Sequence, residues 1–392
     1  KKMVTFSSFR LRIFFSSRRW PVKAAAAVVG GATLVGTYLE RPFADVRDGN
    51  WYSARGQVIQ VEGPSSEGRV VDSPNFLVTP NRWTALGVGA ARFVVVPLVA
   101  ALGHFVVRVQ NSLAVDESDD AYDTFVELLR RRQNDCGLLT VSNHTSVLDD
   151  PFLLAAIVPF PLALDARKMR WGACSQEVCF SRGAFVSAFF GAGKTIPIKR
   201  GGGIDQPGLE AAAEKLWAKG GWVHVFPEGH VYQDGSLGVG RGSHEHNERD
   251  DRTKAAIGAL KWGAAKLIAH APEGKLVVVP FVHDGMSKLM PYDHTGKCES
   301  KIWKTGQKAS VKVGHPLDFD DLIKDHERKT GAKVRRFDFS SNGNNGRRGE
   351  DIDTWIRSSP TDKVLYSRIS RRLEAALVAL QTQARATDLR PT

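Results

Sequence analysis

The sequence predicts an α/β domain with a largely parallel sheet flanked by helices. Helix-like and strand-like patterns alternate from about residue 120 to residue 315, which is typical of parallel strands joined by helical crossovers. The strand-like stretches, such as 222–226 and 276–282, are short apolar runs that suit strands buried on both faces of a sheet. Polar side chains follow three such runs, at strand ends where open α/β sheets bind ligands.

The N-terminal third carries targeting and membrane signals. Residues 1–40 are basic and contain serine, with no acidic residue before Glu40, which is typical of a mitochondrial targeting segment. The alternative is a disordered basic tail. Residues 41–81 are rich in Gly, Pro and Ser and are predicted to form a linker.

Residues 82–108 form the most lipophilic stretch of the chain. Arg92 and His104 interrupt it, and the uncharged core between them is too short to span a bilayer. This N-terminal membrane-associated segment is therefore predicted to be an interfacial anchor that lies in the membrane plane. The alternative is a buried helix of the main domain.

The main domain is predicted to cover residues 109–320, followed by an exposed insertion at 321–360 and a C-terminal amphipathic helix and tail at 361–392. Apolar residues recur at helical spacing in four stretches of this domain. The predicted helices are 116–132, 185–190, 209–219 and 254–269, and the predicted strands are 138–141, 162–165, 195–199, 222–226, 276–282 and 309–313.

Charge and cysteine content limit the class of protein. The chain of 392 residues has a formal net charge of +12, which suits an anionic membrane surface or nucleic acid. Nucleic-acid binding is disfavoured because the chain lacks a zinc-finger or RNA-recognition signature. Four cysteines are too few for a disulfide framework, and Cys174 and Cys179 are expected to be buried free thiols. No metal or cofactor is expected, and His244 and His246 are interpreted as part of a solvated loop.

The residues that carry the chemistry are predicted to lie in 138–154. His144 follows a buried strand, and Asp149 comes five residues later, before Asp150 and Pro151. A neutral imidazole can take a proton from a hydroxyl near neutral pH, and a carboxylate on its other nitrogen fixes the tautomer. Asp150 and Pro151 are predicted to begin a helix as its N-cap and first residue. The alternative is a polar loop whose carboxylates only cap that helix.

Two other predicted strand ends carry polar residues. Arg200 follows one and suits a phosphate, which an arginine binds bidentately. Glu228 and Gly229 follow the other, and the glycine would allow the backbone to approach a ligand closely. A nucleotide-binding loop at 193–195 is rejected because Ala188 stands where that motif requires glycine.

These stretches, in this order, resemble the motif blocks of the glycerolipid acyltransferase family. The matching residues are His144-x4-Asp149, 193–200, Phe226-Pro227-Glu228-Gly229 and Val279-Pro280. The resemblance runs from about residue 82 to residue 316, and the N-terminal leader, 230–252 and 324–360 depart from it. Further stretches are similar to mitochondrial members that remodel cardiolipin, namely 143–151, 170–171, 177–180, 221–229, 261–263 and 283–286.

The resemblance implies acyl exchange between phospholipids such as phosphatidylcholine and lysophospholipids such as monolysocardiolipin, without CoA, on a mitochondrial membrane facing the intermembrane space. His144 would be the general base and Asp149 its orienting carboxylate. A CoA-dependent lysophospholipid acyltransferase and a non-catalytic lipid-binding protein remain alternatives. The sequence does not identify a donor for the oxyanion or protein partners. The substrate-binding residues that the resemblance implies are Lys194, Arg200, Phe226, Pro227, Glu228 and Gly229.

Overall fold

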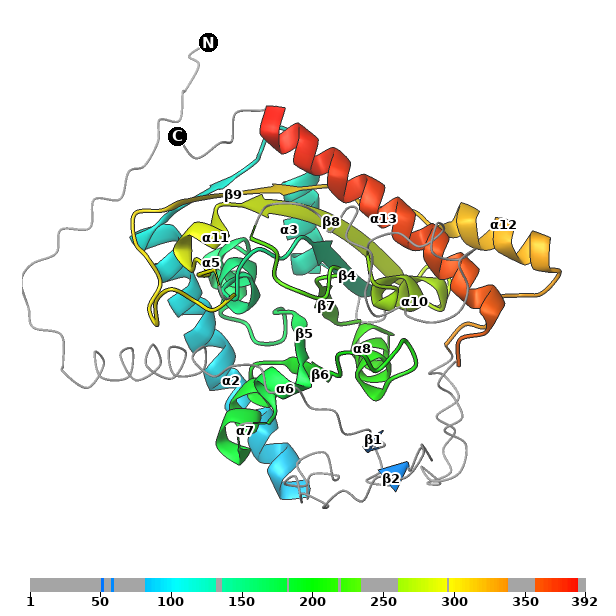
Figure 1. Ribbon diagram of the computed structural model, residues 1–392, viewed down its shortest axis with the longest axis horizontal. Helices are drawn as coiled ribbons and strands as arrows, with labels where there is room; N and C mark the ends of the chain where they lie inside the picture. Colours follow the sequence, from blue (N-terminus) through cyan, green and yellow to red (C-terminus); the bar gives the residue numbers. More distant parts are fainter. Residues whose placement is uncertain are drawn as a thin grey trace, which may run out of the picture.

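A seven-stranded sheet forms the middle layer of the protein in the computed structural model (Figure 1). The structure describes residues 51–52, 58–59, 82–131, 136–181, 183–217, 220–233, 260–294, 296–337 and 357–386. The strand order is β3-β9-β8-β4-β7-β5-β6. The strands are β3 (Ser112–Val115), β4 (Gly137–Ser142), β5 (Trp171–Ser175), β6 (Thr195–Ile198), β7 (Trp222–Val225), β8 (Leu276–Asp284) and β9 (Lys308–Val313).

The sheet is largely parallel, which confirms the predicted fold class. β8, β4, β7, β5 and β6 run in one direction, so their carboxyl ends lie along one edge. β9 pairs with β8 in the antiparallel sense, and β3 is parallel to β9. The polar residues that follow β4, β6 and β7 therefore meet at the same edge of the sheet.

Helices cover both faces of the sheet (Figure 1). One face is covered by α8, α10, α12 and α13, and the other by α2, η1, α3, η2, α4 and α5. Their bounds, with those of the shorter α6, α7 and α11, are α2 (Arg82–His104), η1 (Phe105–Gln110), α3 (Ala121–Arg131), η2 (Asp149–Leu153), α4 (Leu154–Ala156), α5 (Phe160–Ala163), α6 (Gln176–Cys179), α7 (Ala184–Ala192), α8 (Pro207–Trp217), α10 (Gly263–Ala269), α11 (Met286–Leu289), α12 (Asp320–Thr330) and α13 (Pro360–Ala386).

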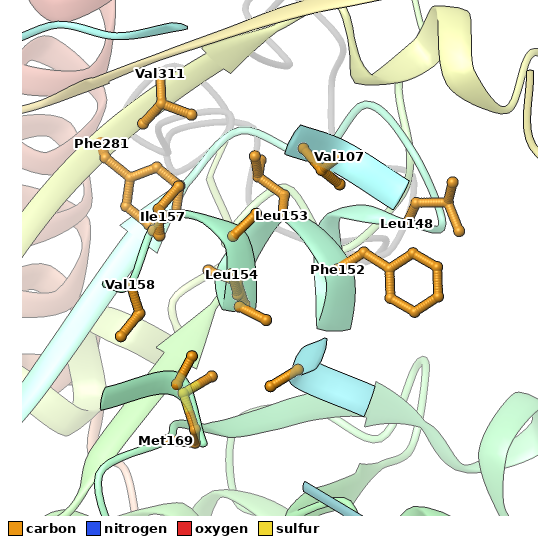
Figure 2. Packing of buried hydrophobic residues seen from close by; sticks show 14 of the residues in the cluster. Val107, Leu148, Phe152, Leu153, Leu154, Ile157, Val158, Met169, Phe281 and Val311 are labelled. Atoms are coloured by element: carbon orange, nitrogen blue, oxygen red, sulfur yellow. The ribbon is translucent and has the colours of Figure 1, made fainter. Parts of the chain in front are cut away.

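Alternating side chains of β4 divide the core between the two faces. Leu138 packs with the α2 side, whereas Leu139 and Val141 pack with the α13 side, as the period of two in a strand requires. Figure 2 shows part of the hydrophobic cluster on the α2 side, in which Leu153 and Ile157 lie beside residues of the sheet. The segment that begins at Asp149 is therefore fixed to the sheet immediately after the candidate catalytic residues.

Several sequence predictions of local structure are wrong. Residues 162–165 do not form a strand, because α5 ends at Ala163 and a turn follows it. An apolar run this short is compatible with either element. β3 and β5 were not expected. Cys174 and Cys179 are joined in a disulfide and are not free thiols.

The predicted exposed insertion at 321–360 is also wrong in its first part. Ile323 and Val334 are buried, and the ring of Phe337 stacks on Trp217 with 4.6 Å between centroids. α12 and the chain as far as residue 337 therefore belong to the core that α13 completes. The rest of this stretch, 338–356, lies outside the described residues.

The lipophilic stretch forms α2 and continues helically through η1. By length and composition, residues 87–110 could cross a membrane, whereas the prediction considered only the shorter uncharged core between Arg92 and His104. One side of this helix packs on η2, α4, α5 and α7 and buries Val96 and Ala100. The other side exposes a stripe of large apolar residues, Val94, Leu98, Phe105 and Val109.

The predictions for several other segments fall on residues that the structure does not describe. These include the targeting segment at 1–40, the loop with His244 and His246, and the C-terminal tail after residue 386. Within the predicted linker, the described residues are β1 (Trp51–Tyr52) and β2 (Val58–Ile59), which pair with each other.

Candidate active site

His144 and Asp149 lie together at the carboxyl end of β4. The Nδ1 of His144 is 2.9 Å from the Oδ2 of Asp149, and that oxygen also accepts the backbone N–H groups of Thr145 and Ser146 at 2.7 and 2.9 Å. Asp149 is fully buried, whereas the His144 side chain remains 19% exposed. Because Nδ1 donates to the carboxylate, the neutral imidazole presents an unprotonated Nε2 as a base.

The segment Phe226-Pro227-Glu228-Gly229, which follows the neighbouring strand β7, fixes the position of His144. The Phe226 ring stacks on the His144 imidazole, with 3.9 Å between centroids and 13° between planes. The Oε1 of Glu228 accepts the backbone N–H of His144 at 2.9 Å. The backbone N–H of Tyr232 donates to the carbonyl of His144 at 2.7 Å. The ring face and both backbone groups of the histidine are thus held by one segment.

Gly229 has a conformational reason for being glycine. Its φ is +72°, and an added Cβ would lie 2.6 Å from the Cε of Lys261. From the sequence, Gly229 was expected to let the backbone approach a ligand closely, and the contact with Lys261 was not predicted. Pro227 also contacts this neighbour, because its carbonyl accepts the backbone N–H of Lys261 at 2.8 Å. The turn that carries Glu228 is therefore held by Lys261.

The prediction that the Asp150 carboxylate caps a helix is wrong. The backbone of Asp150 is extended, with φ and ψ of −119° and 117°, as an N-cap residue would be, but its carboxylate forms an ion pair with the buried Arg170. A Cβ on Gly172 of β5 would lie 2.0 Å from this carboxylate. Asp150 therefore ties the turn after His144 to β5 and is not part of the base.

A second histidine approaches Asp149 from β8. The Nε2 of His283 is 2.9 Å from the carbonyl of Asn143 and 3.5 Å from the Oδ2 of Asp149. The side chain of Asn143 makes two hydrogen bonds to the main chain of His283, at 2.9 and 3.0 Å. This pair joins the ends of β4 and β8. Sequence reasoning gave neither residue a role, although both lie in stretches that carry the resemblance.

His224 lies fully buried beneath Phe226. The Trp222 Nε1–H donates to Thr140 Oγ1 at 2.8 Å, and Thr140 Oγ1 lies 2.8 Å from the Nδ1 of His224. Burial lowers the pKa of His224 well below that of a free imidazole, and the positive charge of Arg170 lowers it further. The ring is therefore neutral near pH 7 and serves as a polar support for Phe226, 4.4 Å away between centroids.

Arg200 joins this edge from β6. Its strand is three positions from β4 in the sheet, or about 14 Å at the main chain, and its side chain is exposed. The structure thus brings His144, Asp149 and Glu228 together, and it places Arg200 on the same edge of the sheet.

Lys194 does not belong to this group. It precedes β6, at the opposite end of the strand from Arg200. Its side chain is buried, and its Nζ donates to the backbone carbonyls of Ala166 and Met169. The prediction that Lys194 helps to hold a substrate phosphate is therefore wrong. Within the described ranges, no three His, Cys, Asp or Glu side chains are grouped to hold a metal ion.

An imidazole hydrogen-bonded to a buried carboxylate, at the tips of a parallel sheet, is an arrangement that can take a proton from a hydroxyl. Residues 123–284 match the family model described as acyltransferase. The chain is 34% identical to an N-acylphosphatidylethanolamine synthase from Arabidopsis thaliana over 232 residues, which cover 59% of this chain and 72% of the relative. The chain therefore belongs to the acyltransferase family and is an enzyme of that class.

Tafazzins are among its relatives, so within the family it is a tafazzin-like glycerolipid acyltransferase. It is 32% identical to a tafazzin from Drosophila melanogaster over 207 residues, which cover 53% of this chain and 47% of the relative. It is 26% identical to a tafazzin from Saccharomyces cerevisiae, with 66% of this chain and 70% of the relative covered. The match thus spans about half of the fly protein's length and more of the yeast protein's.

Proposed function

We propose that this enzyme moves a fatty acyl chain from a phospholipid to a lysophospholipid at a membrane surface, without CoA. The observation that carries the proposal is the hydrogen bond between His144 and Asp149 at the tip of β4, with Nε2 of the imidazole left as the base. General-base catalysis of this kind contributes about 10²- to 10⁴-fold to a rate.

The reaction needs one base and no covalent enzyme intermediate. His144 Nε2 takes the proton of the lysophospholipid hydroxyl, and the hydroxyl oxygen forms a bond to the carbonyl carbon of the donor ester. The imidazolium that results is stabilised by Asp149, which lies 2.9 Å from Nδ1. When the tetrahedral intermediate collapses, the ester bond of the donor breaks, and its departing oxygen takes the proton from Nε2. The donor leaves as a lysophospholipid, and the base is restored.

Arg200 is the cation that we assign to the lipid phosphate. It follows β6 on the same edge as the base, and a guanidinium binds phosphate through two parallel hydrogen bonds. Glu228 accepts the backbone N–H of His144, and we also assign to it a contact with the glycerol of the substrate. The net charge of +12 suits an anionic lipid such as cardiolipin.

The particular lipids that we propose are those that the motif resemblance implies, monolysocardiolipin as acceptor and phosphatidylcholine as donor. The tafazzin relatives and the basic N-terminal segment support a mitochondrial membrane as the location, and we propose the surface that faces the intermembrane space. The Arabidopsis relative, named for synthesis of N-acylphosphatidylethanolamine, favours a second candidate in which the acceptor is the amine of phosphatidylethanolamine. The same base would take a proton from that amine.

A test with two donors and two acceptors separates these functions. The purified chain is mixed with vesicles that contain labelled phosphatidylcholine or with labelled acyl-CoA, in the presence of monolysocardiolipin or phosphatidylethanolamine. We expect label to pass from phosphatidylcholine to monolysocardiolipin without CoA. Label on the ethanolamine nitrogen would support the second candidate, and transfer from acyl-CoA alone would support a CoA-dependent enzyme. Vesicle binding without turnover of either donor would leave only a lipid-binding protein.

Membrane association is proposed to occur through the exposed apolar side of α2 and η1. Val94, Leu98, Phe105 and Val109 lie along one stripe, while the opposite side of the helix packs on the catalytic domain. A full span would carry those packed helices into the bilayer, so an in-plane position is favoured. Exposed Phe160 and Phe185 extend the apolar surface onto α5 and α7, which contact α2.

Vesicle flotation tests this association. Replacing Val94, Leu98 and Phe105 together by Gln is expected to lower the fraction that floats with anionic vesicles at least fivefold. Val364 and Val378 are exposed apolar residues of α13, on the other side of the sheet, and their replacement by Gln is the matched control. Equal flotation of the α2 and α13 variants would contradict the assignment of this surface.

A further inference from the structure

His283 and Asn143 hold each other through main chain and side chain at once. The side-chain amide of Asn143 donates to the carbonyl of His283 at 2.9 Å and accepts its backbone N–H at 3.0 Å. In return, the Nε2 of His283 lies 2.9 Å from the carbonyl of Asn143. Asn143 is the residue before His144, so these three contacts fix the chain where the base begins.

The groups that face the Nε2 of His283 determine where its proton lies. Besides the carbonyl of Asn143, the Oδ2 of Asp149 lies 3.5 Å from this nitrogen. A carbonyl oxygen and an ionised carboxylate oxygen can only accept hydrogen bonds, so Nε2 must carry a proton. The Nε2–H of His283 is therefore directed at both the residue before the base and the carboxylate behind it.

Asp149 is approached from two strands of the sheet. Its Oδ2 accepts the Nδ1–H of His144 and two backbone N–H groups of the turn after β4. His283 comes to the same oxygen from β8, which pairs with β4 in the parallel sense. The side chains of His283 and Asp149 are both fully shielded from solvent. Neighbouring protein groups, and not bulk water, therefore set where this carboxylate lies.

We propose that His283 is a positioning residue for the base. Its Nε2–H holds the carbonyl of Asn143 and faces the Oδ2 of Asp149, which keeps that oxygen aligned with the Nδ1 of His144 while the base takes its proton. The inference rests on the proposed acyl transfer, because it concerns the base of that reaction. In this role His283 transfers no proton and needs no contact with the substrate.

The geometry suits positioning better than a second base. A general base must reach the proton that it takes, directly or through one water. The side chain of His283 is 0% exposed, and its Nε2 is turned toward protein acceptors. Its Nδ1 is buried and has no hydrogen-bond partner among the described residues. Neither nitrogen therefore faces a place where a lipid hydroxyl can bind.

Two amide variants separate the two ring nitrogens of His283. The amide nitrogen of glutamine can lie near the position of Nε2, whereas asparagine is too short and reaches only the position of Nδ1. With the lipid pair that the wild-type enzyme turns over, His283→Asn should lower kcat about 10- to 100-fold and change KM less than about twofold, because a small displacement of a catalytic group slows the reaction by up to about 10²-fold. His283→Gln should recover most of that loss.

His270→Asn is the matched control for loss of stability. His270 is also buried, and its Nε2 bonds to the hydroxyl of Tyr366. It follows α10 and precedes β8, so it lies at the opposite edge of the sheet from His144. The control should lower the temperature of thermal unfolding and keep the wild-type kcat. Equal losses of kcat in His283→Asn and His283→Gln, or an unchanged kcat in His283→Asn, would overturn the positioning role.

Imidazole ¹⁵N NMR of the wild-type enzyme tests the hydrogen bond without a variant and without turnover. The resonances of His283 should show a proton on Nε2, and an unprotonated Nε2 would overturn the inference. This inference fails alone when the wild-type enzyme transfers acyl groups and the kinetic or NMR result is the contrary one. A folded wild-type enzyme that transfers no acyl group would overturn the proposed function and this inference with it.

Discussion

Asp149→Asn tests the negative charge of Asp149, which we propose stabilises the His144 imidazolium in the transition state. The Oδ2 of Asp149 accepts three donors, from His144 Nδ1 and from the backbones of Thr145 and Ser146. An asparagine oxygen at the same place accepts the same three hydrogen bonds. The variant therefore keeps the position of the imidazole and removes the negative charge beside it.

The size of the effect follows from the distance between the two groups. In the transition state His144 becomes an imidazolium whose charge centre lies about 4 Å from that of the carboxylate, and such a pair attracts by about 4 kcal/mol at an effective dielectric constant of about 20. Each 1.36 kcal/mol corresponds to about tenfold in rate, so kcat should fall about 10³-fold. The amide nitrogen replaces Oδ1, which has no partner in the described structure, and this costs about 1–3 kcal/mol of stability.

Steady-state transfer between labelled phospholipid and lysophospholipid in vesicles measures the effect, with thermal unfolding to show that the variant is folded. Asp165→Asn is the control, because Asp165 pairs with the exposed Arg167 away from the site. It should leave kcat unchanged. A folded Asp149→Asn enzyme that keeps kcat within threefold of wild type would refute the reasoning.

Three further predictions concern substrate binding, pH and packing. Arg200→Gln should raise KM for the phospholipid about 10- to 100-fold with a smaller effect on kcat, since a charged hydrogen bond contributes about 1.5–3 kcal/mol, and Arg200→Lys should recover only part of the loss; an unchanged KM in both would contradict phosphate binding. Because burial lowers the pKa of His224 in the folded state, the unfolded chain binds the proton first, and stability should fall as pH drops below about 6.5. Urea unfolding between pH 7.5 and 5.5 should show a smaller loss in His224→Asn, and equal losses would count against a neutral buried His224. Leu154→Ala, at a fully buried position shown in Figure 2, should lower the free energy of unfolding by about 2–5 kcal/mol, whereas Leu98→Ala, at an exposed position, should change it by less than about 0.5 kcal/mol.

The sequence predicted the parts of the site that depend on local geometry. His144 and Asp149 are five residues apart, and a single turn after a buried strand brings them to 2.9 Å. A parallel sheet also predicted that Arg200 and Glu228 lie on the same edge as His144, because strands that run in one direction end at one edge. The ring of Phe226 and the carboxylate of Glu228 reached the histidine through the pairing of β4 with β7.

The parts that sequence reasoning missed depend on contacts between distant segments. His283 lies 140 residues from Asn143 and meets it only because β8 pairs with β4. The backbone of Tyr292 is held by the side chain of Gln233, which lies 59 residues earlier in the chain. Lys194 follows a glycine and looked like a phosphate ligand, but its position before β6 directs it to backbone carbonyls.

The interpretation of Asp150 as a helix cap failed for a related reason. Asp-Pro is a frequent start of a helix, and only the approach of Arg170 next to β5 gives the carboxylate another partner. Burial of α12 likewise could not be predicted from its charged sequence, because its few apolar residues pack under α13. Both cases show a local preference overridden by a partner far along the chain.

The central claim, that His144 is the base of an acyl transfer, is tested most directly by His144→Gln. The glutamine amide retains a donor for Asp149 and lacks a nitrogen that can accept a proton. With His315→Gln as the control at an exposed histidine, we predict that label transfer from phosphatidylcholine falls at least about 10²-fold in the folded His144 variant alone. A folded His144→Gln enzyme that transfers label at a third of the wild-type rate or more would contradict the account.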